Sequence, residues 1–351
     1  MSVVWLASCR ALRLTPHYAA GMTEETDLTV AVTGPTGTFG VALMPLLQAD
    51  DSIGRVIGIA RRPFDPAEHG WTKMEYRRGD VRDPDALREA FDGADVVVHL
   101  AFLIISGGKK TTQAINVEGT LNAFRAAAES GARRFVYASS IAAYGFHRDN
   151  PIGITEEWPT RPADRLFYAQ EKAELEGLLR DEASRHPEID LYLLRPPIVL
   201  GPDAVGGKAQ LSPGLVEVLQ GLHSGIRRLG VIPAVVPELP LQLIHQDDVA
   251  EALRLCVVGA GPPGAYNIAA DDVVNSVDVL RELGFLPLAV PGKPVAAVAR
   301  AISTLPFLPS SLQWVETMSH PAIMDTTKAR TQLGWSPKHS AIESLRATIP
   351  H

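Results

Sequence analysis

The 351-residue sequence contains only two cysteines, Cys9 and Cys256, which excludes a disulfide framework. It has no long basic run, and its formal net charge of −7 leaves no electrostatic footprint for binding a nucleic acid. No run approaches the roughly 18 apolar residues that are needed to span a bilayer. These absences favour a globular protein of the reducing cytoplasm, without a nucleic-acid partner or a membrane span.

The first 22 residues differ from the rest of the chain because they contain no acidic residue. Their apolar run VVWLA is too short for the core of a signal peptide. We expect residues 1–22 to be a disordered extension or an over-long start, since a start at Met22 would place the first strand close to the terminus. An amphipathic targeting segment is the alternative.

From residue 27 to about 196, short apolar runs alternate with amphipathic helical patterns. The runs are residues 28–33, 55–60, 73–78, 94–101, 133–140 and 190–196. Strands separated by helices predict a parallel sheet that is covered on both faces, which is a Rossmann-type doubly wound α/β fold. A sheet of this kind binds its ligand at the carboxyl ends of the strands.

Beyond residue 200 the alternation weakens and prolines become frequent, which predicts a smaller, mostly helical C-terminal lobe that binds the substrate. We expect the Rossmann domain over residues 23–200 and the substrate lobe over residues 201–351. The segment 241–270 reads as a strand end, a helix and one more strand, and we expect it to cross back to the first domain.

The stretch TVAVTGPTGTFG, residues 29–40, carries three glycines at intervals of three, directly after a predicted strand and before a predicted helix. Gly34 would form a sharp turn, Gly37 would let the backbone approach a phosphate, and Gly40 would let the helix pack close to the sheet. The helix N-terminus then offers N–H groups to a pyrophosphate. The motif predicts a dinucleotide site formed by Thr33, Gly34, Thr36, Gly37, Thr38, Phe39 and Gly40.

With three further motifs, this pattern resembles the extended branch of the short-chain dehydrogenase/reductase superfamily, the NAD-dependent epimerase/dehydratase family. GDVRDPDAL resembles the family's adenine-pocket segment, VVHLA resembles the strand end beside the cofactor, and NVEGTLN resembles a helix motif that supports catalysis. The resemblance covers roughly residues 28–340. It implies an NAD(P)-binding domain to which further residues contribute, namely Asp80, Val81, Leu100, Ala101 and Pro196.

The stretch YAQEK places Tyr168 and Lys172 four residues apart, on one face of a predicted helix. A phenol with a pKa of about 10 is a poor acid–base group at neutral pH, but a nearby ammonium favours its phenolate. The resemblance selects Ser140, because the family's catalytic Ser/Thr lies four residues before a Tyr-Gly pair, here Tyr144-Gly145. We expect the catalytic residues to be Ser140, Tyr168, Lys172 and Asn116, and the substrate pocket to include Ser140, Ile141, Tyr144 and Ile198.

The strand 55–60 ends at Ala60, where relatives that prefer NAD usually carry an acidic residue for the ribose 2′-hydroxyl. Arg61 and Arg62 follow, and guanidinium groups match a 2′-phosphate in charge and geometry. A solvated basic pair at the start of a loop is the alternative. The sequence favours NADP over NAD as the cofactor and leaves both open.

Departures from the family indicate the reaction. Sugar-nucleotide epimerases typically carry an asparagine where this chain has Ile198, and an arginine that reaches the diphosphate where it has Leu241. Sugar 4,6-dehydratases place Asp-Glu where Ile141 and Ala142 stand here. The chain is more similar to 3β-hydroxysteroid dehydrogenases and dihydroflavonol reductases, which implies reversible alcohol/carbonyl hydride transfer on a small, largely uncharged substrate.

Two alternatives stay open, a sugar-nucleotide epimerase that uses the same catalytic residues and a non-catalytic protein that senses the cofactor. An intact set of Ser140, Tyr168 and Lys172 argues against the sensor. The ten histidines show no clustered ligand spacing, so no metal site is expected. The resemblance implies a homodimer through helices at 111–130 and 165–183, whereas the residues themselves leave the oligomeric state open.

Overall fold

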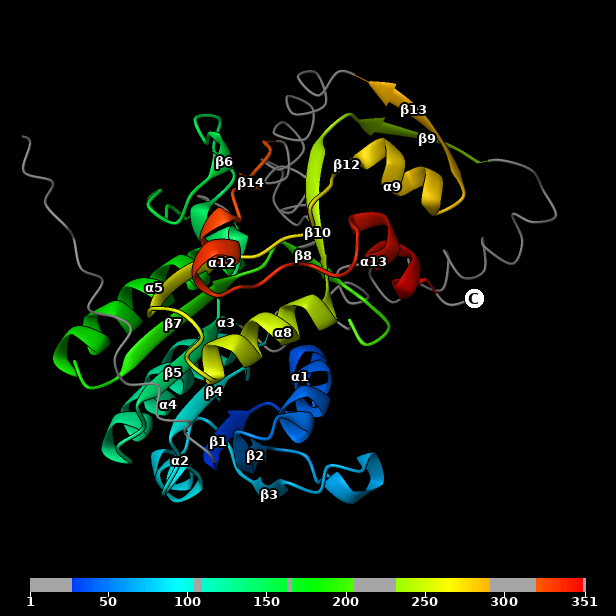
Figure 1. Cartoon of the computed structure of the whole chain (residues 1–351). Coiled ribbons are helices and arrows are strands. Elements are labelled where there is room, and N and C mark those ends of the chain that lie inside the picture. Colours follow the sequence, from blue (N-terminus) through cyan, green and yellow to red (C-terminus); the bar gives the residue numbers. More distant parts are fainter. Residues whose placement is uncertain (1–26, 104–108, 163–165, 205–231, 291–319, 350–351) are drawn as a thin grey trace, which may run out of the picture.

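The computed structural model describes residues 27–103, 109–162, 166–204, 232–290 and 320–349. The expected N-terminal extension and residues 214–222 of the expected substrate lobe lie outside these residues. Within them, a parallel sheet of seven strands is flanked by helices, and a smaller group of strands and helices lies beside one end of it (Figure 1). The Rossmann-type architecture predicted from the sequence is confirmed.

The strand order in the central sheet is β11-β7-β5-β4-β1-β2-β3, and every neighbouring pair is parallel. Each of the six predicted runs forms one of these strands, and the seventh, β11, comes from the returning segment after residue 241. The chain reverses direction across the sheet between β1 and β4, which is the point where such sheets bind ligands. The strands are β1 (Leu28–Thr33), β2 (Ile53–Ala60), β3 (Met74–Arg78), β4 (Val96–His99), β5 (Arg134–Ala138), β7 (Asp190–Arg195) and β11 (Gly264–Asn267).

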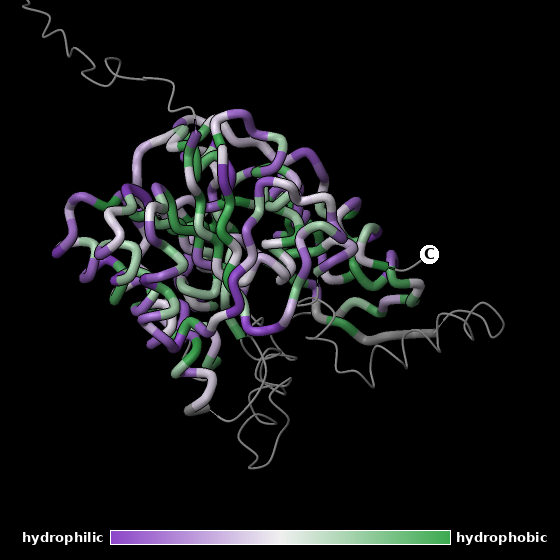
Figure 2. The backbone as a smooth tube through the Cα atoms, turned by 90° about the horizontal axis from the view of Figure 1, so that it is seen from below, coloured by the Kyte–Doolittle hydropathy of each residue, from purple (hydrophilic) through white to green (hydrophobic). Residues whose placement is uncertain are grey.

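Helices cover both faces of this sheet because successive strand residues point in opposite directions. In β1, Val30 and Val32 pack with α1 (Thr38–Ala49) and α8 (Gln246–Val257). Ala31 faces the other side, where the core includes residues of α2 (Pro84–Phe91), α4 (Gly119–Glu129) and α5 (Phe167–Arg185). Figure 2 shows hydrophobic residues along the central strands and hydrophilic ones along the periphery.

Local chemistry explains where these helices begin. The side chain of Asp83 accepts the N–H groups of Asp85 and Ala86, and Pro84 occupies the first helical position, which favours a start of α2 at that residue. At α8 the N-cap is His245, whose ring accepts the N–H of Asp247. No helix in the described part of the chain has the length and apolar content that crossing a membrane requires.

The C-terminal lobe carries short strands as well as helices, whereas the sequence analysis expected it to be mostly helical. The segment 294–318, which belongs to the lobe that the sequence predicts to be mostly helical, lies outside the described residues. The strands of the lobe are β8 (Ile198–Leu200), β9 (Ile232–Pro237), β10 (Pro240–His245), β12 (Val273–Asn275) and β13 (Phe285–Val290), and β14 (Ile323–Met324) pairs with β6 (Ile152–Ile154). Its helices are α9 (Ser276–Glu282), α12 (Thr327–Gln332) and α13 (Ala341–Thr348).

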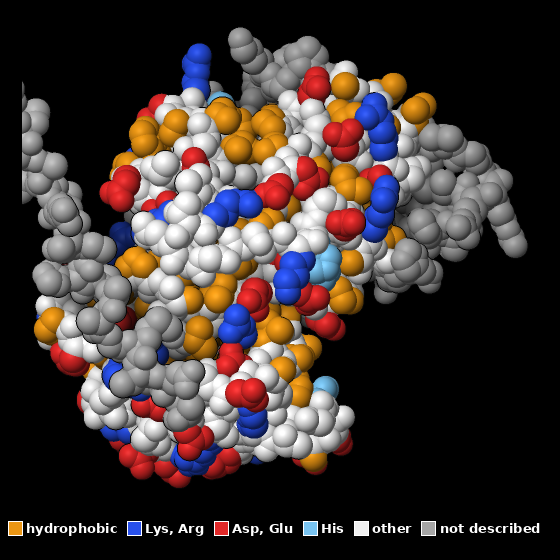
Figure 3. Space-filling view, viewed as in Figure 1, with side chains coloured by type: hydrophobic (Ala, Val, Ile, Leu, Met, Phe, Trp, Pro, Cys, Tyr) orange, Lys and Arg blue, Asp and Glu red, His pale blue; other side chains and the backbone are white. Residues whose placement is uncertain are grey.

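Acidic and basic side chains are interspersed on the face of the molecule drawn in Figure 3. Ion pairs of opposite charge also occur at the surface, such as Arg88 with Glu129. On the face shown there is therefore no continuous basic patch of the kind that binds nucleic acid.

A buried ion pair attaches α5 to the sheet. Arg195 at the end of β7 donates from Nε to Glu176 Oε1 at 2.8 Å and from Nη2 to Glu176 Oε2 at 2.5 Å. Neither residue is more than 1% exposed. The hydroxyl of Ser139 also donates to Glu176 at 2.6 Å. Because an unpaired charge is costly away from water, this bidentate pair fixes the helix relative to both strands.

Removing one partner tests this link. We expect Arg195→Met to lower the free energy of unfolding by about 3–5 kcal/mol, because it leaves the carboxylate of Glu176 buried without its main counter-ion. Arg180→Met is the matched control, since Arg180 reaches the same carboxylate at 3.1 Å from a side chain that is 46% exposed. Its loss is expected to be no more than about 1 kcal/mol. Urea unfolding measures the free energy of unfolding of both variants. Equal losses would contradict the role of the Arg195–Glu176 pair as the buried link between α5 and the sheet.

Candidate active site

A cleft opens at the carboxyl ends of β1, β4, β5 and β7, where the topology places a ligand. Its empty volume of about 1500 Å³ includes the open mouth. Twelve of the predicted site residues line it: Gly34, Gly37, Thr38, Phe39, Gly40, Leu100, Ser140, Ile141, Tyr168, Lys172, Pro196 and Ile198.

The three glycines lie at the turn between β1 and α1, and each meets a different constraint. Gly34 has a φ of +71°, and a Cβ there would lie 3.0 Å from the backbone nitrogen of Ala101. A Cβ on Gly40 would lie 2.4 Å from the carbonyl of Pro35. Gly37 has only one atom near its Cβ position, the Gly34 oxygen at 3.4 Å, and it caps α1 without a side-chain hydrogen bond. The start of α1 is therefore open at Gly37, and a helix N-terminus of this kind favours an anion.

Thr33 lies beneath the floor of the cleft rather than in its wall. Its buried hydroxyl accepts the N–H groups of Leu100 and Ala101, each at 3.2 Å, and lies 2.9 Å from Nδ1 of His99. The other ring nitrogen of His99 lies 3.0 Å from the hydroxyl of Thr120. Burial lowers the pKa of His99 to about 3, so its ring is neutral. These contacts tie together the ends of β1 and β4.

The structure brings Ser140, Tyr168 and Lys172 together. Ser140 follows β5, and its side chain caps a 3-10 turn, η3 (Ile141–Tyr144), by accepting the N–H of Ala142 at 3.2 Å. Burial raises the pKa of Tyr168, and a side-chain hydrogen bond with Ser140 opposes that rise. The hydroxyl and the phenol thus meet at the cleft wall, where both can reach one oxygen atom of a bound molecule.

Lys172 is buried in the same wall, with 3% of its surface exposed. Its Nζ donates to the hydroxyl of Tyr137 at 3.0 Å and to the carbonyl of Ala138 at 2.8 Å. Burial lowers the pKa of Lys172 to about 7, although the carboxylates of Glu171 and Glu176 oppose the shift. The ammonium of Lys172 therefore titrates close to neutral pH.

Asn116 does not line the cleft but holds two elements that do. It is fully buried on a π-helical turn, η2 (Ala114–Glu118), between α3 (Lys109–Gln113) and α4. Its Oδ1 accepts the N–H of Leu103 at 2.8 Å, while Nδ2 donates to the Leu103 carbonyl at 2.9 Å and to Glu171 at 3.0 Å. Asn116 is therefore placed to support the site through the loop after β4 and through α5.

Tyr144 was expected in the wall of the substrate pocket, but the structure places it behind that wall. It is fully buried in η3, and its hydroxyl donates to Asn267 at 2.8 Å and accepts from Arg195 at 2.5 Å. This buried network draws the ring away from the cleft. Several cleft residues were not anticipated from the sequence: Phe102, Tyr137, Phe146, Gln242 and His320.

The predicted adenosine end lies along β2 and β3, outside the cleft lining. Arg61 and Arg62 are both exposed after the end of β2. The hydroxyl of Tyr76 donates to the carbonyls of Ala60 at 3.0 Å and of Arg62, and Arg78 donates to the carbonyl of Arg61 at 3.1 Å. The backbone that carries the two arginines is therefore held, while their guanidinium groups face the surface.

The other predicted cofactor residues outside the cleft lining have separate surroundings. Asp80 pairs with Arg82 at 2.7 Å, and this hydrogen-bonded guanidinium lowers the pKa of the Asp80 carboxyl. Val81 is buried, and a Cβ on Gly119 of α4 would lie 2.6 Å from its Cγ2. Thr36 is exposed in the turn before α1. The structure thus gathers the glycine turn and the catalytic residues in one cleft and leaves the adenosine residues along its outer edge.

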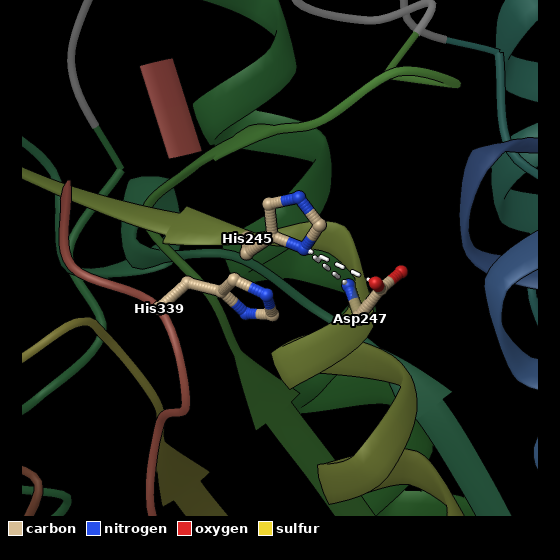
Figure 4. Close-up of side chains that lie close together, drawn as sticks. All are labelled: His245, Asp247 and His339. Carbon is tan, nitrogen blue, oxygen red and sulfur yellow. Dashed lines mark hydrogen bonds and ion pairs between the residues drawn. The ribbon is translucent and has the colours of Figure 1, made fainter. Parts of the chain in front are cut away.

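Outside the cleft, His245, Asp247 and His339 bring potential metal-ligand atoms within 4.8 Å of one another (Figure 4). Nδ1 of His245 accepts the N–H of Asp247 at 3.2 Å, and its ring stacks on that of His339 with centroids 4.0 Å apart. Rings stacked in this way direct their nitrogen lone pairs side by side rather than toward one point. His339 also lies 3.2 Å from buried Asp248. These contacts join α8 to the segment before α13.

Comparisons with known proteins agree with the Rossmann-type fold. A model of the NAD dependent epimerase/dehydratase family matches residues 30–269. An uncharacterised protein of Mycobacterium tuberculosis is 28% identical and covers 90% of this chain and 82% of its own length. Sterol demethylase protein B of Methylococcus capsulatus is 31% identical over 50% of this chain and 52% of its own. The Bordetella bronchiseptica enzyme WbmG, solved with NAD and UDP, is 19% identical with a TM-score of 0.67, and the match covers 93% of this chain and 94% of that one.

Two glycine variants separate binding from folding. We expect Gly37→Ala to weaken binding of NAD or NADP at least about tenfold, because a methyl group would occupy the space for the pyrophosphate. Its stability should stay within about 1 kcal/mol of wild type. Gly40→Ala should instead destabilise the fold by about 1–3 kcal/mol, because its Cβ would overlap Pro35. Calorimetric titration and thermal unfolding measure the two effects. Unchanged binding by Gly37→Ala would place the phosphate elsewhere.

Proposed function

The chain belongs to the NAD-dependent epimerase/dehydratase family, in the extended branch of the short-chain dehydrogenase/reductase superfamily, since the family model spans residues 30–269. On that premise we propose that it is an NAD(P)-dependent oxidoreductase that interconverts an alcohol and a carbonyl group on a small, largely uncharged substrate. Tyr168 is the acid–base residue, Ser140 binds the substrate oxygen, and Lys172 and Asn116 support them. A cytoplasmic location and a homodimer through α4 and α5 belong to the same proposal.

The observation that carries this proposal is the apolar lining of the cleft beyond the catalytic residues. Ile198 and Leu241 both line it, at the two positions where sugar-nucleotide enzymes carry polar ligands. Lys172 is the only lysine or arginine among the described lining residues, and it is engaged with Tyr137. A diphosphate bound here would have no guanidinium partner among those residues, whereas an uncharged molecule needs none.

The residues present fit a nicotinamide dinucleotide. The turn at Gly37 leaves room for a phosphate at the start of α1, and no acidic residue occupies the first turn of that helix. When bound, the nicotinamide supplies or accepts the hydride. The same cleft that holds this turn also holds the catalytic side chains, so cofactor and substrate sites adjoin.

In this reaction the side chains of the protein transfer the proton. During carbonyl reduction the Tyr168 hydroxyl donates its proton to the carbonyl oxygen, and during alcohol oxidation the phenolate takes the proton from the alcohol. The Ser140 hydroxyl donates a hydrogen bond to that same oxygen. The ammonium of Lys172 lowers the cost of forming the phenolate, against the burial that raises the pKa of Tyr168.

A second candidate function is epimerisation of a sugar nucleotide. It is supported by the similarity in fold to WbmG, whose structure contains NAD and UDP. Tight binding of UDP in calorimetry, together with epimer formation and no net oxidation of cofactor, would favour this candidate over the reductase. The apolar residues Ile198 and Leu241 weigh against it.

Replacing the acid–base residue tests the main proposal. We expect Tyr168→Phe to lower the rate of carbonyl reduction about 10²–10⁴-fold while cofactor binding is retained, because the variant lacks the phenolic hydroxyl that donates the proton. The measurement is oxidation of NADPH and NADH against a panel of ketones, aldehydes and nucleotide sugars. Full activity of the variant would exclude Tyr168 as the proton donor.

We also propose that NADP is the preferred cofactor, because Arg61 and Arg62 follow β2 where no acidic residue stands. Arg61→Asp is expected to lower the ratio of kcat/KM for NADPH to that for NADH at least about tenfold, since a carboxylate repels the 2′-phosphate. Arg55→Asp makes the same change of charge at an exposed position near the start of the same strand, and it should leave the ratio unchanged. An unchanged ratio in Arg61→Asp would contradict the proposed preference for NADP.

A further inference from the structure

Lys172 is enclosed by hydrogen-bond acceptors and by the rings of Phe102, Tyr137 and Tyr168, and the Phe102 ring lies nearest to its ammonium. An ammonium group has three N–H donors. Nζ directs hydrogen bonds to the hydroxyl of Tyr137 and to the carbonyl of Ala138. It also lies 3.6 Å from the centroid of the Phe102 ring, well within the range of about 6 Å for a cation–π contact. Phe102 thus lies where water would otherwise solvate the charge.

The same ring also contacts the acid–base residue. The Phe102 and Tyr168 rings meet edge to face, with centroids 5.8 Å apart at an angle of 87°. Such an arrangement is favourable between aromatic rings beyond the area that it buries. Phe102 therefore touches both members of the Tyr-x-x-x-Lys pair, one with its face and the other through an edge contact.

The position of Phe102 is held from behind. The next residue, Leu103, has both its N–H and its carbonyl bound by the side-chain amide of Asn116. The same amide donates to Glu171, the neighbour of Lys172 on α5. The loop after β4 and the catalytic helix are thus joined through one buried asparagine, which keeps the ring over the ammonium.

Every charged or titratable group around Lys172 bears on its protonation. From α5 these are Glu171, Glu176 and Tyr168, and from β4 and β5 they are His99 and Tyr137. Burial keeps His99 neutral and raises the pKa of Tyr137, so neither carries charge near neutral pH. The two carboxylates favour the ammonium, and burial opposes it. The face of an aromatic ring, like the two carboxylates, favours the ammonium form of Lys172.

We propose that Phe102 is a positioning residue of the active site, whose ring face keeps Lys172 in its ammonium form beside Tyr168. The contact itself is a property of the protein without its ligands. Its consequence for proton transfer rests on the function proposed above.

The test reads the protonation of Lys172 without turnover. The full-length protein is labelled with trace acetic anhydride between pH 5 and 11, and the acetylation of Lys172 is measured by peptide mass spectrometry relative to exposed Lys338. Only the neutral amine reacts, so the midpoint of the profile reports the pKa, expected near 7 in the wild type. Phe102→Leu should move this midpoint downward by about 0.4–1.5 pH units, because the charged form loses its cation–π partner.

Two further variants make the result specific to the ring face. Phe102→Met keeps a long apolar side chain without a ring, so its midpoint should move downward as well. Phe102→Tyr keeps the face and should retain the wild-type midpoint. Unchanged midpoints in both Phe102→Leu and Phe102→Met would overturn the proposal, as would an equal shift in Phe102→Tyr.

The pH dependence of alcohol oxidation separates this inference from the proposed function. A less charged Lys172 raises the pKa of Tyr168, so in Phe102→Leu the rising limb of the oxidation profile should move to higher pH. If the labelling shift occurs in a protein that oxidises no alcohol, Phe102 acts as proposed and the oxidoreductase function is wrong. If the protein oxidises an alcohol but Phe102→Leu shows no shift in labelling, the oxidoreductase function is supported and the proposed role of Phe102 is wrong.

Discussion

The buried pairing of Glu176 with Arg195 is the constraint on which the site depends. It fixes α5, and with it Lys172 one helical turn earlier, against the strand that ends at Arg195. The hydroxyl of Ser139 binds the same carboxylate, so the end of β5 shares the anchor. Pro196 then leads the chain directly into the cleft wall. Elements that are far apart in the sequence therefore meet at one pair of charges that tolerates little displacement.

Burial away from water makes this ion pair intolerant of displacement. It also shifts the pKa of the titratable groups in the cleft. Burial disfavours the charged forms of both Lys172 and Tyr168, and fixed partners rather than solvent decide how far each pKa moves. Glu171, Glu176 and the ring of Phe102 act on the ammonium, and the Ser140 hydroxyl acts on the phenol. Apolar lining residues such as Ile198 and Leu241 extend this environment along the cleft.

The sequence predicted the features that depend on local spacing. Tyr168 and Lys172 share a helix face because they are four residues apart, and the glycine turn follows from its place between a strand and a helix. Tyr144 was misplaced because its partners, Arg195 and Asn267, come from strands far along the chain. The contact of Phe102 with Lys172 likewise depends on how a loop packs on a helix, which no periodicity records. Stacking of His245 on His339 arises in the same way.

The π-helical turn that carries Asn116 makes this helix sensitive to chain length rather than to composition. A wide turn holds one residue more than the α-helix around it, and that residue is what points the Asn116 amide inward at Leu103 and Glu171. Deleting one of the other residues of this turn, Ala114, Ile115, Val117 or Glu118, would close it to regular α-helix, in which successive residues are about 100° apart, and Asn116 would lose its inward position. The asparagine would still be encoded, yet it would face elsewhere. A homologue aligned with a one-residue gap at this turn would therefore retain the asparagine in its sequence but not the position of its side chain.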